Sequence, residues 1–335
     1  MGKIISWGII LGIGFAAMSC GFSPDMGLQD DSITKKTKLY DDAIKSNPGD
    51  MSVYMDRGDI YLDNDLYVDA INDYSKAIEL DPINSVGYIS RAEAYFENGQ
   101  FYKAIIDLSK AISLDPQEPE LYVKRGSAYG MDNQFLEAID DYSKAIEIDP
   151  TDPDIFIFRA EIRESLEHSR KAIDDYTAAI KLDPTNILAY GKRGDSYRKL
   201  GLSDLATEDY DRIEKLDPDH PLVPYFRAMV LLDSEDYKEA LKEFDRAIEY
   251  GASDYSSFHN RGVALLNLDQ FQLAKQDFDK AIEINMNNGL AYYNRALAIG
   301  AMAEMAFRPE GSAVELLDAA IEDSITACEM DREHC

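Results

Sequence analysis

The sequence predicts an all-α solenoid of stacked helical hairpins. An arginine recurs every 34 residues, and glycine or alanine always follows it. An aromatic residue stands three positions before seven of the eight arginines, and alanines and aromatics recur later in each unit with the same period. A fixed period of this length is typical of repeats that bury their apolar faces against one another. The arginines are Arg57, Arg91, Arg125, Arg159, Arg193, Arg227, Arg261 and Arg295.

Each unit is expected to contain two amphipathic helices. The small residue after the arginine and the later alanine allow the two helices to approach closely, and the aromatics fill the gaps between them. An Asp-Pro pair ends the second helix in five units. Short polar residues that can accept backbone N–H groups precede six of the first helices. These predicted N-caps are Asp50, Asn84, Asp152, Asn186, Asp254 and Asn288.

This pattern resembles the tetratricopeptide repeat family over residues 51 to 331. The resemblance implies a right-handed superhelix of about eight repeats with the first helices on the concave face. A half-repeat at 33–50 is expected to cap the N-terminal end, and the array is expected to fill 51–335 without a separate catalytic domain. Twelve extra residues are expected near 302–313, with a loop around 307–312. The expected repeats are 51–84, 85–118, 119–152, 153–186, 187–220, 221–254, 255–288 and 289–335.

The N-terminus has the features of a targeting segment. An apolar run from Ile4 to Met18 follows Lys3 and ends at Ala16-Ala17-Met18-Ser19-Cys20. This ending resembles a bacterial lipobox. The resemblance implies a cleaved signal peptide at 1–19, a lipid on Cys20 and a flexible tether at 20–32. Gly21 favours an outer-membrane lipoprotein that faces the periplasm, and the alternatives are an uncleaved membrane anchor or an ordinary signal peptide.

Composition excludes several classes of function. The chain has 63 acidic and 34 basic residues, a net charge of −29, which argues against nucleic acid and polybasic lipid binding. The four histidines show no metal-ligand spacing, and no nucleotide or catalytic motif is present, so we expect no metal, no cofactor and no enzyme. Seven residues of continuous helix would hold Cys328 and Cys335 about 10 Å apart. We therefore expect no disulfide between them unless the helix end frays.

An acidic residue follows each arginine of the first seven repeats by 16 positions, and Asp323 keeps this place after the insertion. An acid in every copy favours structural ion pairs, either within a repeat or across neighbours. The alternative is a ladder of arginines that binds an anionic ligand. The four pairs singled out are Arg57 with Asp73, Arg125 with Asp141, Arg193 with Asp209, and Arg261 with Asp277.

The last three repeats contain the candidate binding residues. Asn260 and Asn294 occupy the same place in adjacent first helices, where amides could pair with an extended peptide. In the alternative interpretation the asparagines face water and the nearby aromatics are core residues displaced by Pro224. Relatives that bind chaperone C-termini use a lysine–asparagine clamp, whose first slots here hold Met55 and Asp59. The candidate site is Tyr225, Phe226, His259, Asn260, Tyr293 and Asn294.

We therefore expect a membrane-tethered adaptor that holds a peptide or a protein partner. The alternative is a structural subunit of an envelope assembly, such as secretion, pilus or cell-wall machinery, that uses its convex face or C-terminal end. The last helix carries more apolar residues than one buried stripe needs. We expect this end to form a homodimer or to be capped by a partner, unless the insertion around Phe307 folds back over it.

Overall fold

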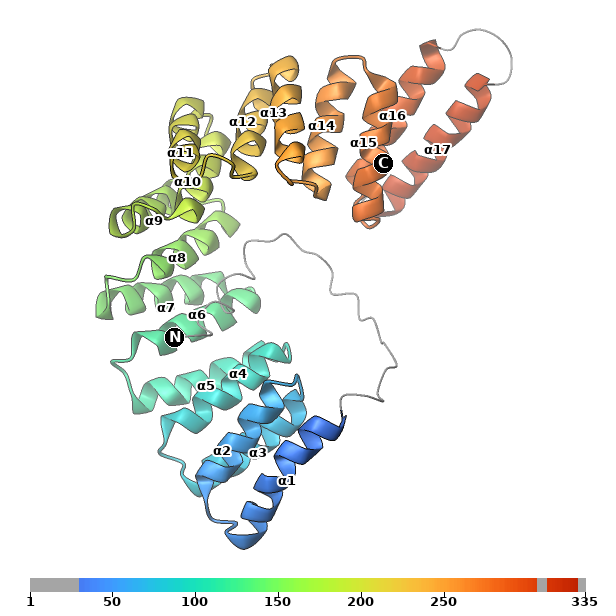
Figure 1. Cartoon of the computed structure of the whole chain (residues 1–335). Helices are drawn as coiled ribbons and strands as arrows, with labels where there is room; N and C mark the ends of the chain where they lie inside the picture. The colour runs from blue at the N-terminus through green and yellow to red at the C-terminus, as the bar shows by residue number, and fades with distance from the viewer. Residues whose placement is uncertain (1–29, 306–311, 331–335) are drawn as a thin grey trace. The chain divides into compact units, whose positions relative to one another are not determined.

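The structure is a computed structural model that describes residues 30–305 and 312–330. These residues form α-helices joined by short turns and include no strand (Figure 1). They belong to two compact units, Met1–Pro184 and Thr185–Cys335, called unit 1 and unit 2. The expected signal peptide, Cys20 and residues up to 29 of the tether lie outside the described residues.

Helices alternate between the first and second positions of successive repeats, which confirms the predicted all-α repeat architecture. The helices of unit 1 are α1 (Asp30–Ser46), α2 (Met51–Leu62), α3 (Tyr67–Leu80), α4 (Ser85–Glu97), α5 (Phe101–Leu114), α6 (Pro119–Met131), α7 (Phe135–Ile148), α8 (Pro153–Ser165) and α9 (Ser169–Leu182). The helices of unit 2 are α10 (Ile187–Lys199), α11 (Ser203–Leu216), α12 (Leu222–Asp233), α13 (Tyr237–Glu249), α14 (Tyr255–Asn267), α15 (Phe271–Ile284), α16 (Gly289–Met305) and α17 (Ser312–Met330). Helix α1 precedes the first full repeat and begins at Asp30, before the expected residue 33.

Side-chain caps fix the starts of the first helices. The carboxylate of Asp50 accepts the backbone N–H of Ser52 at 3.1 Å, at the start of α2. The other predicted caps accept first-turn N–H groups in the same way, so all six are confirmed. They are Asn84, Asp152, Asn186, Asp254 and Asn288.

The turn between the two helices of a repeat contains one residue in the left-handed region. These residues recur every 34 positions with φ between 58° and 73°. Only two of them are glycine, which explains why composition did not reveal the turn. They are Asp65, Gly99, Asn133, Glu167, Gly201, Glu235 and Asp269.

The eighth repeat differs at the position where the other repeats turn. The insertion expected near 302–313 is partly helical, because residues 302–305 belong to α16 and residues 312–313 belong to α17. Ala303 holds the place of the left-handed residue but is helical, because alanine, methionine and glutamate around it favour a continuing helix. Helix α16 has 17 residues, whereas the other first helices have 12 or 13. Helix α17 has 19 residues, whereas most second helices have 14. Most of the extra chain lengthens two helices; residues 306–311, including the expected fold-back at Phe307, lie outside the described residues.

The core of most repeats places an aromatic ring of the second helix against the small residue of the first, and Leu108 takes this place in the second repeat. A Cβ atom on Gly58 would lie 2.6 Å from the ring of Tyr74, and one on Gly262 would lie 2.8 Å from the ring of Phe278. Both rings are fully buried. A larger residue after the arginine would therefore displace the main aromatic group of the core.

Each arginine of the series except Arg227 binds the acid of its own repeat through two parallel hydrogen bonds. Arg125 donates from Nε and Nη2 to the two carboxylate oxygens of Asp141, both at 2.7 Å. The Arg125 side chain is 19% exposed and that of Asp141 is 8% exposed. The hydrogen bond and charge of Asp141 raise the pKa of Arg125. The same geometry occurs at Arg57, Arg91, Arg159, Arg193 and Arg261, and between Arg295 and Asp323.

The third nitrogen of the guanidinium binds the preceding repeat. Nη1 of Arg125 donates to the hydroxyl of Ser109 on α5 at 3.0 Å, and Nη1 of Arg295 donates to Asp279 on α15 at 2.7 Å. The partner lies 16 residues before the arginine in both cases. One arginine therefore joins three helices, and the sequence-based alternatives of pairing within a repeat or across neighbours both occur.

The sixth repeat departs from this pattern. Arg227 binds Asp211 and Glu214 of the preceding repeat at 2.5 and 2.7 Å. Glu243, which stands in the acidic series, instead pairs with Arg246 one turn along its own helix at 2.9 Å. The longer glutamate reaches a neighbour on α13 that an aspartate could not reach as easily.

Cys328 lies two residues before the end of α17 and is disulfide-bonded. The expectation that Cys328 and Cys335 form no bridge with each other involves Cys335, which lies outside the described residues. Cys20 lies outside them as well.

Candidate partner-binding surface

The first helices form the inner side of each unit's stack. Helices α10, α12, α14 and α16 pack directly against one another in sequence, and so do α2 with α4 and α6 with α8. In the described part of the chain, no two second helices pack as closely. Side chains on the inner face of successive first helices can therefore form a continuous row.

A hydrogen-bonded row crosses three first helices of unit 2. The amide nitrogen of Asn260 on α14 donates to the hydroxyl of Tyr225 on α12 at 3.2 Å. The amide nitrogen of Asn294 on α16 donates to Nε2 of His259 at 3.0 Å. Nδ1 of His259 therefore carries the ring proton and donates to Oδ1 of Asn260 at 3.3 Å. We call Tyr225, His259, Asn260 and Asn294 the polar row.

The imidazole of His259 is the buried centre of the polar row. It is 7% exposed and stacks on the ring of Tyr255, with centroids 5.4 Å apart. Burial lowers the pKa of His259, and the hydrogen bond to Asn260 offsets only part of this effect. The histidine is therefore neutral at neutral pH, as the hydrogen bonds of the row require.

Four of the six predicted binding residues are joined by hydrogen bonds, and Phe226 and Tyr293 lie outside this hydrogen-bonded row, although the ring of Phe226 packs edge-on against that of Tyr225 with centroids 5.8 Å apart. The ring of Phe226 stacks on Tyr210 of α11 with centroids 5.0 Å apart, so it belongs to the packing between helices. Tyr293 is 37% exposed beside the row on α16. The sequence placed the two asparagines in equivalent positions, but it gave no sign that His259 would bridge them.

The two asparagines differ in their capacity to bind a ligand. Asn260 directs its amide nitrogen at both Tyr225 and the sulfur of Met229, each at 3.2 Å. Asn294 donates one hydrogen bond, to His259, and its amide oxygen accepts none from a described residue. A side-chain amide has two donors and one acceptor oxygen, so Asn294 can still bind an extended backbone.

Negative charge gathers on the first helices of the first two repeats. Burial, Glu93 and Asp65 together raise the pKa of Glu97 on α4. Asp59 on α2 accepts a hydrogen bond from the hydroxyl of Tyr74 at 2.7 Å, and Asp56 is exposed on the same helix. These acids give the inner face of unit 1 an attraction for basic groups.

Three basic residues of the first helices, Lys124, Arg198 and Lys199, are engaged by acids. Lys124 pairs with Glu120 at 3.3 Å. On α10, Lys199 binds Asp195 at 3.0 Å, and Arg198 binds Asp195 at 2.7 Å as well as Asp233 on α12 at 2.6 Å. These cations hold the helices in place and are poorly available to an anionic ligand.

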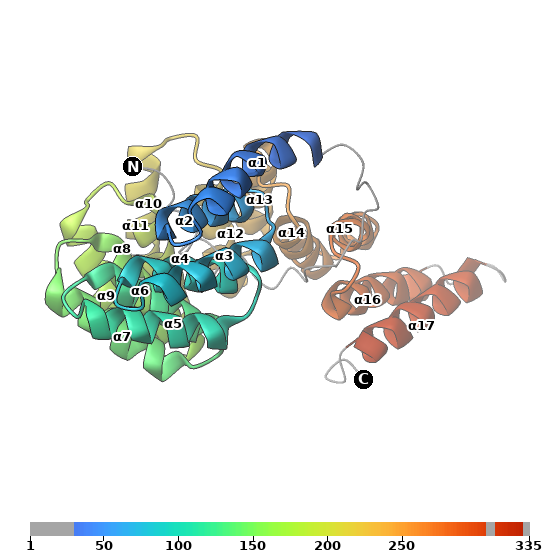
Figure 2. The same ribbon diagram turned by 90° about the horizontal axis from the view of Figure 1, so that it is seen from below.

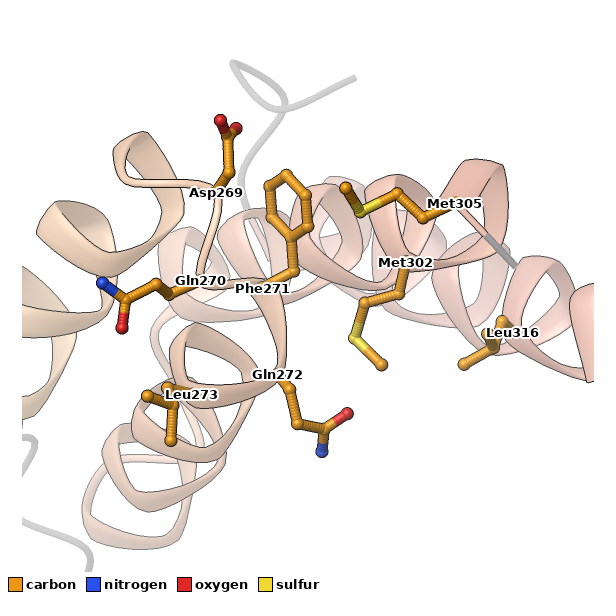
Figure 3. A pocket seen from close by; sticks show the side chains of 8 residues that line it. All are labelled: Asp269, Gln270, Phe271, Gln272, Leu273, Met302, Met305 and Leu316. Carbon is orange, nitrogen blue, oxygen red and sulfur yellow. The ribbon is translucent and has the colours of Figure 1, made fainter. Parts of the chain in front are cut away.

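A cavity of about 590 Å³ opens where the eighth repeat is lengthened. Figure 3 shows Met302 and Met305 of α16 between Phe271 of α15 and Leu316 of α17. The extra turns of α16 and α17 supply three of these four apolar side chains. This cavity could not be predicted from the sequence, because the helix end that carries Met302 and Met305 falls within the insertion expected near 302–313. No group of potential metal ligands occurs among the described residues.

Because His259 is buried in the polar row, the stability of the protein should fall as the pH is lowered. The pKa of His259 in the folded chain lies below its ordinary value of 6.5, so the unfolded chain binds more protons as the pH falls through that value. The stabilisation is thus present above pH 6.5 and is lost on acidification. Between about pH 7.5 and about pH 5.5, the free energy of unfolding in urea should fall less for His259→Gln than for the wild type. The exposed His168→Gln should behave like the wild type; equal losses in all three proteins would contradict this role.

Comparison with known proteins identifies the repeats. A sequence model described as tetratricopeptide repeat matches residues 38–84, 159–221 and 225–289, which together cover more than half of the chain. Related models described as tetratricopeptide or TPR repeats match 74–106, 92–133 and 119–152. No curated protein matches the chain.

Several solved structures resemble the model. A tetratricopeptide repeat protein from Parabacteroides merdae is 19% identical, with 71% of this chain and 98% of that chain covered and a TM-score of 0.58. The APC/C hetero-tetramer Cut9–Hcn1 is 20% identical, with 90% and 59% covered and a TM-score of 0.54. YrrB, titled a TPR protein with an unusual peptide-binding site, is 23% identical, with 56% and 96% covered and a TM-score of 0.46. The repeat models, one of which alone matches more than half of the chain, show that the chain belongs to the tetratricopeptide repeat family.

Proposed function

We propose that this protein is a non-enzymatic scaffold that binds a peptide segment or a protein partner on the inner face of unit 2. The observation that carries the proposal is the polar row across α12, α14 and α16, which ends at the partly satisfied amide of Asn294. An extended backbone laid along these helices would meet donors and acceptors at fixed spacing. Tyr293, 37% exposed beside the row, would add apolar contact.

The charge of the inner face supports a partner segment with basic residues. Within unit 1, acids on α2 and α4 attract lysine and arginine. Within unit 2, the cations Arg198 and Lys199 of α10 are already paired with acids. We propose no catalytic activity, because the carboxylates that recur in every repeat are consumed by structural ion pairs. Asp141, for example, has both oxygens bound by Arg125.

A paired substitution tests the row. The double variant Asn260→Ala, Asn294→Ala should weaken a bound peptide by about 2 kcal/mol, because it removes two hydrogen-bonding amides. Peptides that bind the wild type are first selected from an array of short basic and acidic sequences, and their affinities are then measured by fluorescence anisotropy. Asn267→Ala is the matched control, since Asn267 lies on α14 but is exposed outside the row.

A control for folding and a contradicting outcome complete the test of the polar row. Thermal unfolding of the double variant should stay close to that of the wild type, so that lost affinity is not lost folding. If the double variant binds normally while charge reversal at Asp56 and Asp59 abolishes binding, the site lies on unit 1 and the proposal is wrong.

The second candidate function is a structural subunit of an envelope assembly, such as secretion, pilus or cell-wall machinery. It is favoured by the apolar side chains exposed on α17, which suit a folded neighbour better than an extended peptide. Binding of short peptides separates the two functions: an inner-face adaptor binds them, and an assembly subunit binds only folded partners.

We further propose that the protein is held at the bacterial outer membrane, facing the periplasm, by a lipid on Cys20. The apolar run before Cys20 supports this location. The disulfide of Cys328 supports it independently, because disulfides persist in oxidising compartments. Among the described residues, no helix has the length and hydropathy to cross a bilayer. The alternative is an uncleaved N-terminal membrane anchor.

Mass spectrometry of the protein purified from membranes tests the anchor. Acyl chains on Cys20 and loss of residues 1–19 should shift the mass of the wild type, and Cys20→Ser should retain the leader and carry no lipid. Gly21→Ala serves as the control that leaves the acceptor cysteine intact. A wild-type mass equal to that of the unprocessed chain would contradict lipidation and favour the uncleaved anchor.

A further inference from the structure

Helix α17 exposes the face on which a following first helix would stack. Every other second helix of unit 2 packs between two first helices, as α15 does between α14 and α16. Among the described residues α17 packs only against α16 to this extent, and it lies beside α16 in both views (Figures 1 and 2). No further helix of the described chain packs to this extent on its far side.

The register of the arginine contacts identifies that surface. In earlier repeats the residue two positions after the buried acid receives the arginine of the next first helix: Ser109 follows Asp107, and Asp279 follows Asp277. In α17 the buried acid is Asp323, so the equivalent residue is Ile325. An isoleucine replaces the hydrogen-bond acceptor at the place where the next arginine would bind.

Ile325 is part of an apolar stripe. Leu317, Ile321 and Ile325 are four residues apart and therefore share one face of the helix, together with Val314. Their exposed fractions are 48%, 57%, 55% and 59% for Leu317, Ile321, Ile325 and Val314. A helix that stacks here would meet side chains that prefer an apolar partner.

An acidic stripe runs beside the apolar one. Glu315, Asp318, Glu322 and Glu329 are exposed, and none forms an ion pair with a described residue. Helix α17 contains no lysine or arginine that could neutralise them. A complementary helix would therefore carry basic residues along one side of its apolar stripe. A second copy of α17 fits poorly, because antiparallel pairing would bring acidic stripes together in a chain of net charge −29.

We propose that α17 docks an amphipathic helix of a partner protein, with an apolar stripe flanked by lysines and arginines, in the manner of the first helix of a ninth repeat. The surface is separate from the polar row, so this proposal stands or falls independently of peptide binding on the inner face. The partner helix supplies an apolar side chain opposite Ile325 where the array's own repeats supply an arginine.

A pair of designed peptides tests the proposal on the full chain. One is an amphipathic helix with leucines on one face and lysines beside them, and the other has glutamate in place of each lysine. The wild type should bind the lysine peptide, more weakly at high salt, and should not bind the glutamate peptide. The double variant Ile321→Gln, Ile325→Gln should bind the lysine peptide at least about tenfold more weakly, because it loses two isoleucine contacts that docking would bury.

Control variants separate docking from general stickiness and from misfolding. Leu188→Gln with Leu205→Gln removes two exposed leucines elsewhere in unit 2 and should leave affinity unchanged. Because the substituted isoleucines are exposed, thermal unfolding should also be unchanged. The proposal is overturned if the wild type binds both peptides equally or neither, or if the isoleucine variant binds as well as the wild type. It is also overturned if sedimentation shows a wild-type dimer that the isoleucine variant abolishes, because the occupant is then a second copy.

Discussion

The fold depends on one guanidinium group that binds three helices at once. Arg125 holds Asp141 in its own repeat and Ser109 in the preceding one, while its cationic carbon lies 5.8 Å from the rings of Tyr122 and Tyr129. Burying a cation is unfavourable unless its donors are satisfied, and this geometry uses all three nitrogens of the guanidinium. The contact therefore fixes both the angle within a hairpin and the stacking between hairpins.

Repetition of this contact decides which residues remain for function. The series of acids and arginines is internally paired, so neither is available to a ligand over most of the array. The inner-face lysine and arginine on α10 are also paired with acids. What remains is the polar row of unit 2, the acids of the first two repeats and the open face of α17. Each of these surfaces breaks the repeat pattern, which is why they are the places to look for partners.

Much of the fold could be predicted because the period fixes the register. Once the arginines were aligned, the helix starts, the close approach at glycines such as Gly58 and the acid 16 residues on all followed from sequence position. The lengthening of α16 could not be predicted in this way, because it depends on Ala303 continuing the helix where other repeats turn. The hydrogen bonds of His259 to Asn260 and Asn294 could not be predicted either, because they require two first helices to approach each other in space. Glu243 shows the limit of alignment: it keeps the register but binds Arg246 within its own helix.

Arg125 joins neighbouring repeats as well as the two helices of its own repeat. A double-mutant cycle with Ser109→Ala and Arg125→Ala, measured by urea unfolding, isolates the contact across the repeat boundary from the ion pair with Asp141. The account predicts a coupling free energy of about 1 kcal/mol or more, as for a hydrogen bond to a charged group. A coupling free energy of zero, with additive losses from the two single variants, would show that the arginine stabilises only its own hairpin and would contradict the account.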